Sequence, residues 1–299
     1  MQPLSLSRSD GLWKAHFAAM GGPCEVLVDS EVESVALELA DEAARCAWRI
    51  EHKYSRYRPD NIVARINSAR GAPVEVDDET AKLLDFADRA HELSAGGFDI
   101  TSGVLRRAWT FDGSERSPTT AEIERLLKLV GWQKAIWNRP SLTLLPDMQI
   151  DFGGIGKEYA VDQAAQTLAR LSDVPTLINF GGDLAVTRPR RDGRPWCVGI
   201  ADVAGPDRLQ PRAAKVIELT AGALATSGDT FRYVTSNGQR LPHILDPRCG
   251  EPVRRAPRSV TVAAATCTNA GMLTTLAMLR GPGAEEFLAA EGVRHWVQR

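Results

Sequence analysis

The spacing of apolar residues predicts several amphipathic helices. Beyond residue 30 the apolar positions recur every three or four residues, as expected for a helix with one face against a core: Val35, Leu39, Ala43, Ala47 and Ile50. Similar patterns predict helices over 60–67, 77–94, 157–171 and 269–280. Acidic residues cap the start of the helix over 77–94, and Thr119 with Glu122 fits a capping box ahead of IERLLKLV.

Short apolar runs between Gly, Pro and Asn turns predict strands. Two form an opening pair, 12–20 and 24–29, around Gly21-Gly22-Pro23. The others are expected over 135–137, 142–145, 148–152, 176–180, 196–200, 215–219, 224–228, 231–235 and 259–265, and a short α/β tail ends the chain. Helices concentrated early and strands late, without βαβ alternation, predict an α+β fold with mostly antiparallel sheet rather than a doubly wound Rossmann fold.

Composition and charge are those of an ordinary globular protein. Of the 299 residues 43% are hydrophobic and 25% are charged, and no repeat or compositional break marks a linker, so we expect one domain over 1–299. The net charge of −2 argues against a nucleic-acid partner. The densest basic run, RPRRDGR at 188–194, contains Pro and Gly and is expected to be a solvated loop.

The spacing of the cysteines and the length of the apolar runs argue against several classes of protein. Five cysteines without a CxxC pair argue against a disulfide framework or a zinc knuckle. No run of 18 apolar residues and no leader with an apolar region is visible, so we expect no membrane span and a cytoplasmic protein. A periplasmic location is the expectation if a leader is missing.

The segment IDFGGIGKEYAVD at 150–162 carries the strongest chemical signal. Glycine-freed backbone amides beside a helix start are suited to bind an anion. The segment is neither a Walker A loop nor a complete GxGxxG, and its DFG triplet lacks an upstream HRD. A tight strand-to-helix turn is the structural alternative for such a glycine cluster.

Four further segments place an acid or a histidine beside glycines: GGFDIT at 96–101, NFGGDLAV at 179–186, ATSGDTFRY at 225–233 and PHILDPRCGEPV at 242–253. Each alone could be a turn, because Gly supplies positive φ and Asp accepts backbone N–H bonds. Together, each next to a predicted strand end, they indicate loops that converge on one site.

Taken together, these segments resemble the ApbE family of FAD:protein FMN transferases. SRYRPDNIVARIN is similar to the family's S-x-Y-x-x-x-S-x-x-x-x-x-N, GGFDITSG to its G-x-FDIT, and DFGGIGKEYAVD to its D-x-GGIAKGYAVD. INFGGDLAV carries its GGD, and TSGD with HILDPRCGEPV is similar to its SGD…HI-x-DP-x-TG-x-P block. The resemblance covers about 55–280, in the family's order.

The resemblance implies an α+β, T-fold-like architecture of two packed, mostly antiparallel sheet-and-helix halves around an FAD cleft. Members cleave FAD at its pyrophosphate, attach FMN through a phosphoester to a Thr or Ser of an acceptor protein, and release AMP with Mg²⁺. The implied FAD contacts are Met20, Tyr57, Asp99, Ile100, Thr101, Lys157, Gln163 and Ile244. Met20 and Tyr57 would offer apolar surface to FAD, and Lys157 would offset phosphate charge. The structural alternative for Met20 is a buried strand residue.

His243 matches the histidine of the HI-x-DP loop, and its titration range suits a general base for a hydroxyl or an acid for a leaving oxygen. Asp183 and Asp229 are expected either to hold loops or to contact the ligand, and both alternatives stay open. Asp162 is expected one helical turn beyond Glu158.

The sequence departs from the family at its metal ligands. The resemblance implies Mg²⁺ held by an aspartate, a threonine and a backbone carbonyl, but Gly271 stands at the aspartate position. Thr275 matches the threonine, Thr274 occupies a position that is sometimes a second aspartate, and Ala160 would supply the carbonyl. Glu158, where the family usually has glycine, is a candidate for the missing carboxylate; the alternative is a solvent-facing glutamate near a helix N-terminus.

Three functions follow from this interpretation. The first is FMN transfer from FAD to a Thr or Ser of a protein. The second is a metal-dependent FAD pyrophosphatase that releases FMN and AMP. The third is a non-catalytic flavin-binding protein with a degraded metal site, which the glycine at 271 favours.

Overall fold

The computed structural model describes residues 4–112, 117–203, 213–229, 233–236 and 239–299. Its helices are α1 (Glu33–Tyr54), α2 (Ile62–Asn67), α3 (Asp78–Leu93), α4 (Thr120–Leu127), α5 (Gly156–Leu171), α6 (Cys267–Arg280) and α7 (Ala284–Ala290). Shorter 3₁₀ helices are η1 (Ile100–Arg107), η2 (Trp132–Lys134) and η3 (Gly281–Gly283). The first two residues of the strand expected over 231–235, Phe231 and Arg232, lie outside the described residues.

Eight strands form the main sheet, in the order β1-β2-β3-β7-β8-β11-β14-β15. They are β1 (Ser5–Ser9), β2 (Leu12–Ala19), β3 (Gly22–Val28), β7 (Thr176–Phe180), β8 (Asp183–Val186), β11 (Gly222–Gly228), β14 (Ser259–Ala264) and β15 (Arg294–Gln298). Smaller sheets pair β9 (Trp196–Ala201) with β10 (Ala213–Leu219), β12 (Tyr233–Ser236) with β13 (Gln239–Pro242), and β6 (Ser141–Thr143) with β4 (Val74–Glu75) and β5 (Ile136–Asn138). Every strand pair in the described ranges is antiparallel, which confirms the α+β prediction.

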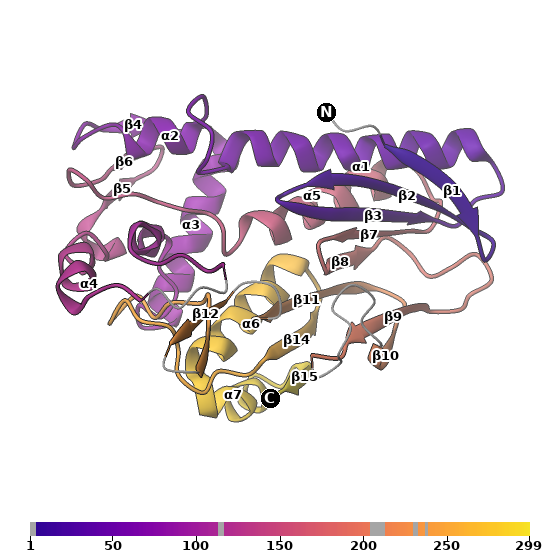
Figure 1. Cartoon of the computed structure of the whole chain (residues 1–299). Coiled ribbons are helices and arrows are strands. Elements are labelled where there is room, and N and C mark those ends of the chain that lie inside the picture. The colour runs from indigo at the N-terminus through magenta and orange to yellow at the C-terminus, as the bar shows by residue number, and fades with distance from the viewer. Residues whose placement is uncertain (1–3, 113–116, 204–212, 230–232, 237–238) are drawn as a thin grey trace.

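Alternating side chains give the main sheet two buried faces. Val26 and Ile178 point into the core shared with α1, α5 and α6, whereas Leu27 and Leu177 join a second cluster on the opposite face. Trp196 and other residues of β9 and β10 cover that second cluster. Figure 1 shows α1 and α5 beside the first strands of the sheet, and the paired strands β9 and β10 below β7 and β8. The main cluster draws residues from Ala15 to Leu288, nearly the whole chain.

The capping signals predicted from the sequence for α3 and α4 are confirmed. Asn61 and Asp77 cap α2 and α3 by accepting from Ala64 N and Thr80 N. Thr119 and Glu122 form the expected capping box of α4. Among the described helices, none combines the length and apolar character needed to cross a bilayer.

The strand expected over 148–152 is wrong. Residues 148–152 lack strand pairing, and their backbone groups are instead paired by single contacts from elsewhere in the chain. Ile150 N donates to Asn67 Oδ1 at 2.7 Å, Asn67 Nδ2 donates to Ile150 O at 3.0 Å, and Asp151 N donates to Ile100 O at 2.8 Å. A side-chain amide thus replaces a neighbouring strand, and the apolar run alone could not reveal this.

Glu79 ties α3 to α1 and α5. Its carboxylate accepts from Arg49 and from Lys53, each at 2.7 Å, and from the hydroxyl of Tyr159 at 3.1 Å. Burial alone would raise the pKa of Glu79, but the bonds from Arg49 and Lys53 outweigh it and lower the pKa from 4.5 to about 2. The folded state therefore favours the ionised form of Glu79.

We expect Glu79→Gln to lower the free energy of unfolding at pH 7 by about 1–2 kcal/mol, because the partly exposed ion pairs of Glu79 are screened by solvent. A depressed carboxyl pKa stabilises the fold above pH 4.5, and this contribution is lost as the pH falls toward 2. Urea unfolding at pH 7 and pH 3 should show the difference shrinking in acid. Glu92→Gln, which breaks an exposed pair with Arg89, is the matched control. An equal loss at both pH values would contradict the prediction.

Candidate functional site

Lys157 lies where α5 begins, against the turn between β7 and β8. Its Nζ is 2.6 Å from Asp183 Oδ2 and donates to the carbonyl of Gly181 at 3.3 Å. Gly181 and Gly182 take φ values of 62° and 96°, left-handed conformations that favour glycine. The side chain of Lys157 keeps 29% of its surface exposed.

Asp183 holds this arrangement from inside the protein. Its side chain is almost fully buried, and its Oδ1 accepts from Thr226 N of β11 at 2.9 Å. Burial opposes the charge of Lys157, but Asp183 and Glu158 outweigh burial and raise its pKa. Lys157 is thus a cation held in place by Asp183, and the contacts of Asp183 support the loop-holding alternative.

Glu158 points into the protein, not into solvent as in the surface alternative. It is only 8% exposed and lies against Gly271 of α6. A Cβ at position 271 would stand 2.5 Å from Glu158 Cγ and 2.8 Å from its Oε1, closer than real contacts allow. Burial, and secondarily the charge of Asp183, raise the pKa of Glu158 from 4.5 to about 8, against the opposing effect of Lys157. The side chain of Glu158 thus fills the space that Gly271 leaves.

Asp162 fixes α6 against α5. Its carboxylate accepts from Cys267 N at 2.7 Å, from Thr268 N at 2.9 Å and from the Thr268 hydroxyl at 2.6 Å. These donors lie in the first turn of α6, where a carboxylate also complements the helix dipole. The expected position of Asp162, one turn beyond Glu158 on α5, is confirmed, and its contacts show that it docks the second helix.

The two candidate threonines of α6 differ in their contacts. Thr274 is fully buried; its hydroxyl donates to Gly271 O at 2.9 Å and shares a 2.8 Å hydrogen bond with Ser227. Thr275 is half-buried and Ala160 is fully buried on the facing helix α5. The role of Ser227 in positioning Thr274 was missed, although it lies within the quoted ATSGD segment.

Asp99, Ile100 and Thr101 form a second group at the start of η1. Asp99 accepts from Thr101 N, from the Thr101 hydroxyl and from Trp132 N at 2.6–2.9 Å, while Gly131 N donates to the Thr101 hydroxyl at 2.8 Å. Ile100 is buried and its carbonyl accepts from Asp151 N. The side chains of Asp99 and Thr101 and the carbonyl of Ile100 therefore connect the start of η1 to residues 131–132 and to Asp151.

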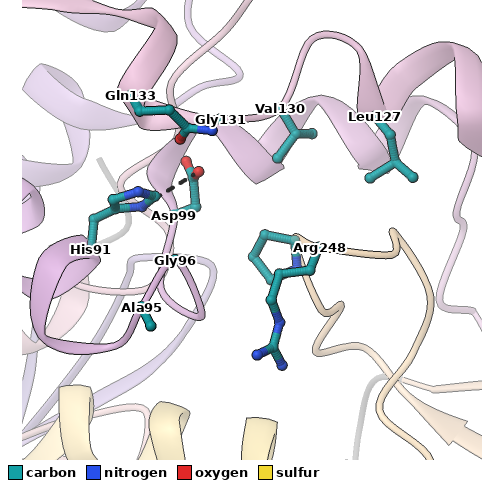
Figure 2. Close-up of a pocket in the computed structure, with 10 residues that line it drawn as sticks. His91, Ala95, Gly96, Asp99, Leu127, Val130, Gly131, Gln133 and Arg248 are labelled. Carbon is teal, nitrogen blue, oxygen red and sulfur yellow. Dashed lines mark ion pairs between the residues drawn. The ribbon is translucent and has the colours of Figure 1, made fainter.

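Asp99 also lines a cavity of about 430 Å³, drawn in Figure 2. His91 Nδ1 lies 3.6 Å from Asp99 Oδ2 in this cavity. The lining residues are His91, Ala95, Gly96, Asp99, Leu127, Val130, Gly131, Gln133, Pro247 and Arg248. His91 and Gln133 were missed, because neither stands in a glycine-rich segment with an acid.

Tyr57 stands beside this second group, on the surface. It is 82% exposed, and the guanidinium of Arg56 lies 5.9 Å from the centre of its ring. Arg56 also donates to Asp151 Oδ2 and to Gly103 O, each at 2.8 Å. A Cβ at Gly103 would be 2.5 Å from that of Asp151, so only glycine allows this approach. Sequence reasoning missed the Arg56–Asp151 pair, although both residues lie in quoted segments.

His243 and Ile244 form a third group, between β13 and the loop 246–250. The His243 ring packs edge-on against Phe111, with 6.3 Å between ring centres. Ile244 packs on the main core, and its carbonyl accepts from Val253 N at 3.3 Å. Next to the loop, Trp109 Nε1 donates to Gly250 O at 2.8 Å. The described contacts do not join His243 to Lys157.

Asp229 is engaged by two arginines. Its carboxylate lies 2.8 Å from Arg258 Nε and 3.1 Å from Arg240 Nε, and it is 4% exposed. These contacts support the loop-holding alternative for Asp229.

Met20 and Gln163 are the remaining residues of the predicted FAD contacts. Met20 is in the tight turn after β2, with φ of 57°, so neither the strand expected over 12–20 nor the alternative of a strand residue extends to it. With Gly21 it makes the two-residue turn between paired Ala19 and Gly22. Gln163 lies on α5 one turn beyond Tyr159, whose hydroxyl contacts α3.

Comparison with known proteins gives one consistent family. The protein-family model described as the ApbE family matches residues 20–296. The FAD:protein FMN transferase of Haemophilus influenzae is 29% identical over 260 residues, which cover 83% of this chain and 74% of the relative. The structure of the ApbE protein of Thermotoga maritima superposes with a TM-score of 0.85 at 31% identity, covering 96% of this chain and 94% of that one. The flavinyl transferase ApbE of Pseudomonas stutzeri gives 0.80 at 26% identity, covering 98% and 91%. The chain, with the Lys157–Asp183 pair at the start of α5 and its antiparallel central sheet, belongs to the ApbE family.

Proposed function

We propose that this protein transfers the FMN part of FAD to a hydroxyl group of an acceptor protein and releases AMP. Family membership and the names of the relatives support this activity. The observation that carries it in this structure is the Lys157–Asp183 pair, a fixed cation beside the Gly181-Gly182 turn and the start of α5. Such a site suits the pyrophosphate of FAD.

The reaction exchanges the phosphoanhydride bond of the FAD pyrophosphate for a phosphoester bond to the acceptor. The acceptor oxygen attacks the phosphorus on the riboflavin side of the FAD pyrophosphate, and the bond from that phosphorus to the bridging oxygen breaks. AMP leaves with the bridging oxygen, and the hydroxyl proton passes to a base. We assign His243 as that base, since a neutral imidazole accepts a proton near neutral pH.

The other residues bind and orient FAD in this proposal. Lys157 offsets the charge that develops on the pyrophosphate oxygens. Exposed Tyr57 and the side chain of Met20 offer apolar surface to the ring systems, and the Asp99–Thr101 segment forms a rigid wall. Gln163 and Ile244 are the remaining proposed FAD contacts. Asp183 and Asp229 act through the cations that they hold, Lys157 for one and two arginines for the other.

The contact between α5 and α6 fits a small divalent cation such as Mg²⁺. It holds a buried carboxylate whose Oε2 has no hydrogen-bond partner in the described part of the chain, an arrangement that a hard cation would satisfy. Glu158, the hydroxyls of Thr275 and Thr274 and the carbonyl of Ala160 are the proposed ligands. Since Thr274 already bonds Gly271 and Ser227, Thr275 is the better hydroxyl donor. When bound, the cation would neutralise pyrophosphate charge.

The acceptor is proposed to be a protein with an exposed Thr or Ser. Incubation of an acceptor domain that carries an Asp-Gly-x-Thr-Ser/Thr site with this protein, FAD and Mg²⁺ should add the mass of FMN and form an equal amount of AMP. Mass spectrometry of the intact acceptor and chromatography of the nucleotides measure the two products. The same acceptor with its threonine replaced by alanine is the control.

Two results would contradict this proposal. Intact FAD beside an unmodified acceptor would favour a flavin-binding protein. AMP and free FMN without a modified acceptor would indicate a pyrophosphatase.

The assignment of His243 as the base has its own test. A His243→Gln variant that modifies the acceptor at the wild-type rate would remove His243 from the mechanism.

A further inference from the structure

The carboxylate of Glu158 occupies a position that a side chain of α6 would otherwise take. The Cβ position of residue 271 overlaps the end of the Glu158 side chain, with separations of 2.5 Å to Cγ, 2.8 Å to Oε1 and 2.9 Å to Cδ. With Glu158 in this conformation, the carboxylate between these helices comes from residue 158 on α5, in the space that a side chain at residue 271 on α6 would need. Glycine at 271 is what lets Glu158 reach this place.

The surroundings of Glu158 leave part of its carboxylate unsatisfied. Oε2 is buried, and it has no hydrogen-bond partner among the residues that the structure describes. The nearest ammonium group, that of Lys157, is engaged by Asp183 and by the Gly181 carbonyl. An unpaired polar atom of this kind is costly to bury, and a bound cation would offset the cost.

Further oxygen donors lie on the two helices that enclose this carboxylate. Gly271, which Glu158 contacts, is one turn before Thr274 and Thr275 on α6, and Ala160 lies two residues beyond Glu158 on α5. Grouped His, Cys, Asp and Glu side chains that could hold a metal by themselves are absent from the described residues. A site here would thus rely on one carboxylate with hydroxyl, carbonyl and water oxygens, a set that Mg²⁺ and Mn²⁺ accept and that zinc sites rarely use.

We propose that Glu158 is the carboxylate ligand of a divalent-cation site between α5 and α6, supplied from α5 in place of a side chain at position 271. The inference deepens the proposed function, on which it rests for the cation's use in phosphoryl transfer. The competing explanation is that Glu158 is a protonated side chain that only fills space, and a glutamine would then serve equally well.

The test is calorimetric titration of the metal-free full-length protein with MnCl₂ in the absence of FAD. We expect the wild-type protein to bind Mn²⁺ and Glu158→Gln to bind it at least about tenfold more weakly, because loss of a direct ligand costs no less than loss of its supporting partners. The double variant Glu158→Gly/Gly271→Asp moves the carboxylate to α6 and should recover binding to within about threefold of wild type. Glu124→Gln, at an exposed position of α4, is the matched control.

Thermal melting by circular dichroism confirms that each variant is folded before titration. Equal Mn²⁺ affinity in wild type and Glu158→Gln would overturn the proposal, as would a wild-type protein that does not bind Mn²⁺. If the folded double variant does not bind Mn²⁺, the idea that a carboxylate on α6 can replace the one on α5 is overturned. Loss of binding in Glu158→Gln supports the site even if FAD is never turned over, and in that case only the proposed function fails.

Discussion

Replacement of Lys157 by methionine is expected to slow AMP formation from FAD by about 100-fold or more. Methionine keeps much of the length of the side chain but removes the cation beside the Gly181-Gly182 turn. A preorganised charge next to the reacting phosphate stabilises the transition state more than the ground state, and removal of one such group commonly costs two to three orders of magnitude, or about 3–4 kcal/mol. The rate is measured by chromatography of AMP with saturating FAD and acceptor.

The same substitution leaves Asp183 buried without its cation, so it should also destabilise the fold by about 3 kcal/mol. The double variant Lys157→Met/Asp183→Asn separates the two effects, because it removes the unpaired charge and keeps the shape. We expect it to regain much of the lost stability and none of the activity. Recovery of AMP formation in the double variant would show that Lys157 only neutralises Asp183.

Glu158→Gln is expected to make the metal-free protein more stable at pH 8 by about 2–4 kcal/mol. The pKa of Glu158 is about 8 in the folded protein and 4.5 when unfolded, so the folded state holds an extra proton between these values. Stability from this group is therefore highest below pH 4.5 and declines by about 1.4 kcal/mol per pH unit until pH 8. Glutamine carries no charge and avoids this loss.

Urea unfolding in EDTA at pH 5, 6.5 and 8 measures the effect. The advantage of Glu158→Gln should grow from pH 5 to pH 8, while the exposed control Glu124→Gln should follow the wild type. A constant difference between Glu158→Gln and wild type at all three pH values would mean that Glu158 is already ionised at pH 5.

Local sequence signals were sufficient for most helices and for the class of fold. The capping box at Thr119 and the apolar period of α1 depend on residues within a turn or two of one another, and both are seen in the structure. The segment 148–152 was misassigned because its backbone partners, Asn67 and Ile100, come from other parts of the chain. Apolar runs report burial, but they do not report which group completes the hydrogen bonds.

In the candidate site too, residues with a local sequence signal were predicted, and contacts between distant segments were not. Lys157 and Asp183 could be selected because each stands in a segment rich in glycine, and the structure pairs them. The fit of Glu158 over Gly271, in contrast, joins residues far apart in sequence through the packing of α5 on α6. The sequence shows a glutamate at 158 where the ApbE family usually has glycine, and a glycine at 271 where it has aspartate. Only the structure shows that the Glu158 side chain occupies the space next to Gly271. His91 gave no local signal, because its contact with Asp99 forms only in the folded loop.

The pairing of β3 with β7 has a consequence for how the protein is made. β3 ends at Val28 and β7 begins at Thr176, so the opening hairpin leaves the ribosome about 150 residues before its neighbour in the sheet. At about 5–20 residues per second the wait is on the order of ten to thirty seconds. During that time β3 has an unpaired edge and its Val26 and Val28 lack α5 and β7 to pack against. The unpaired edge of β3 is therefore exposed to aggregation during this interval, and the long-range pairing of β3 with β7 favours slow folding.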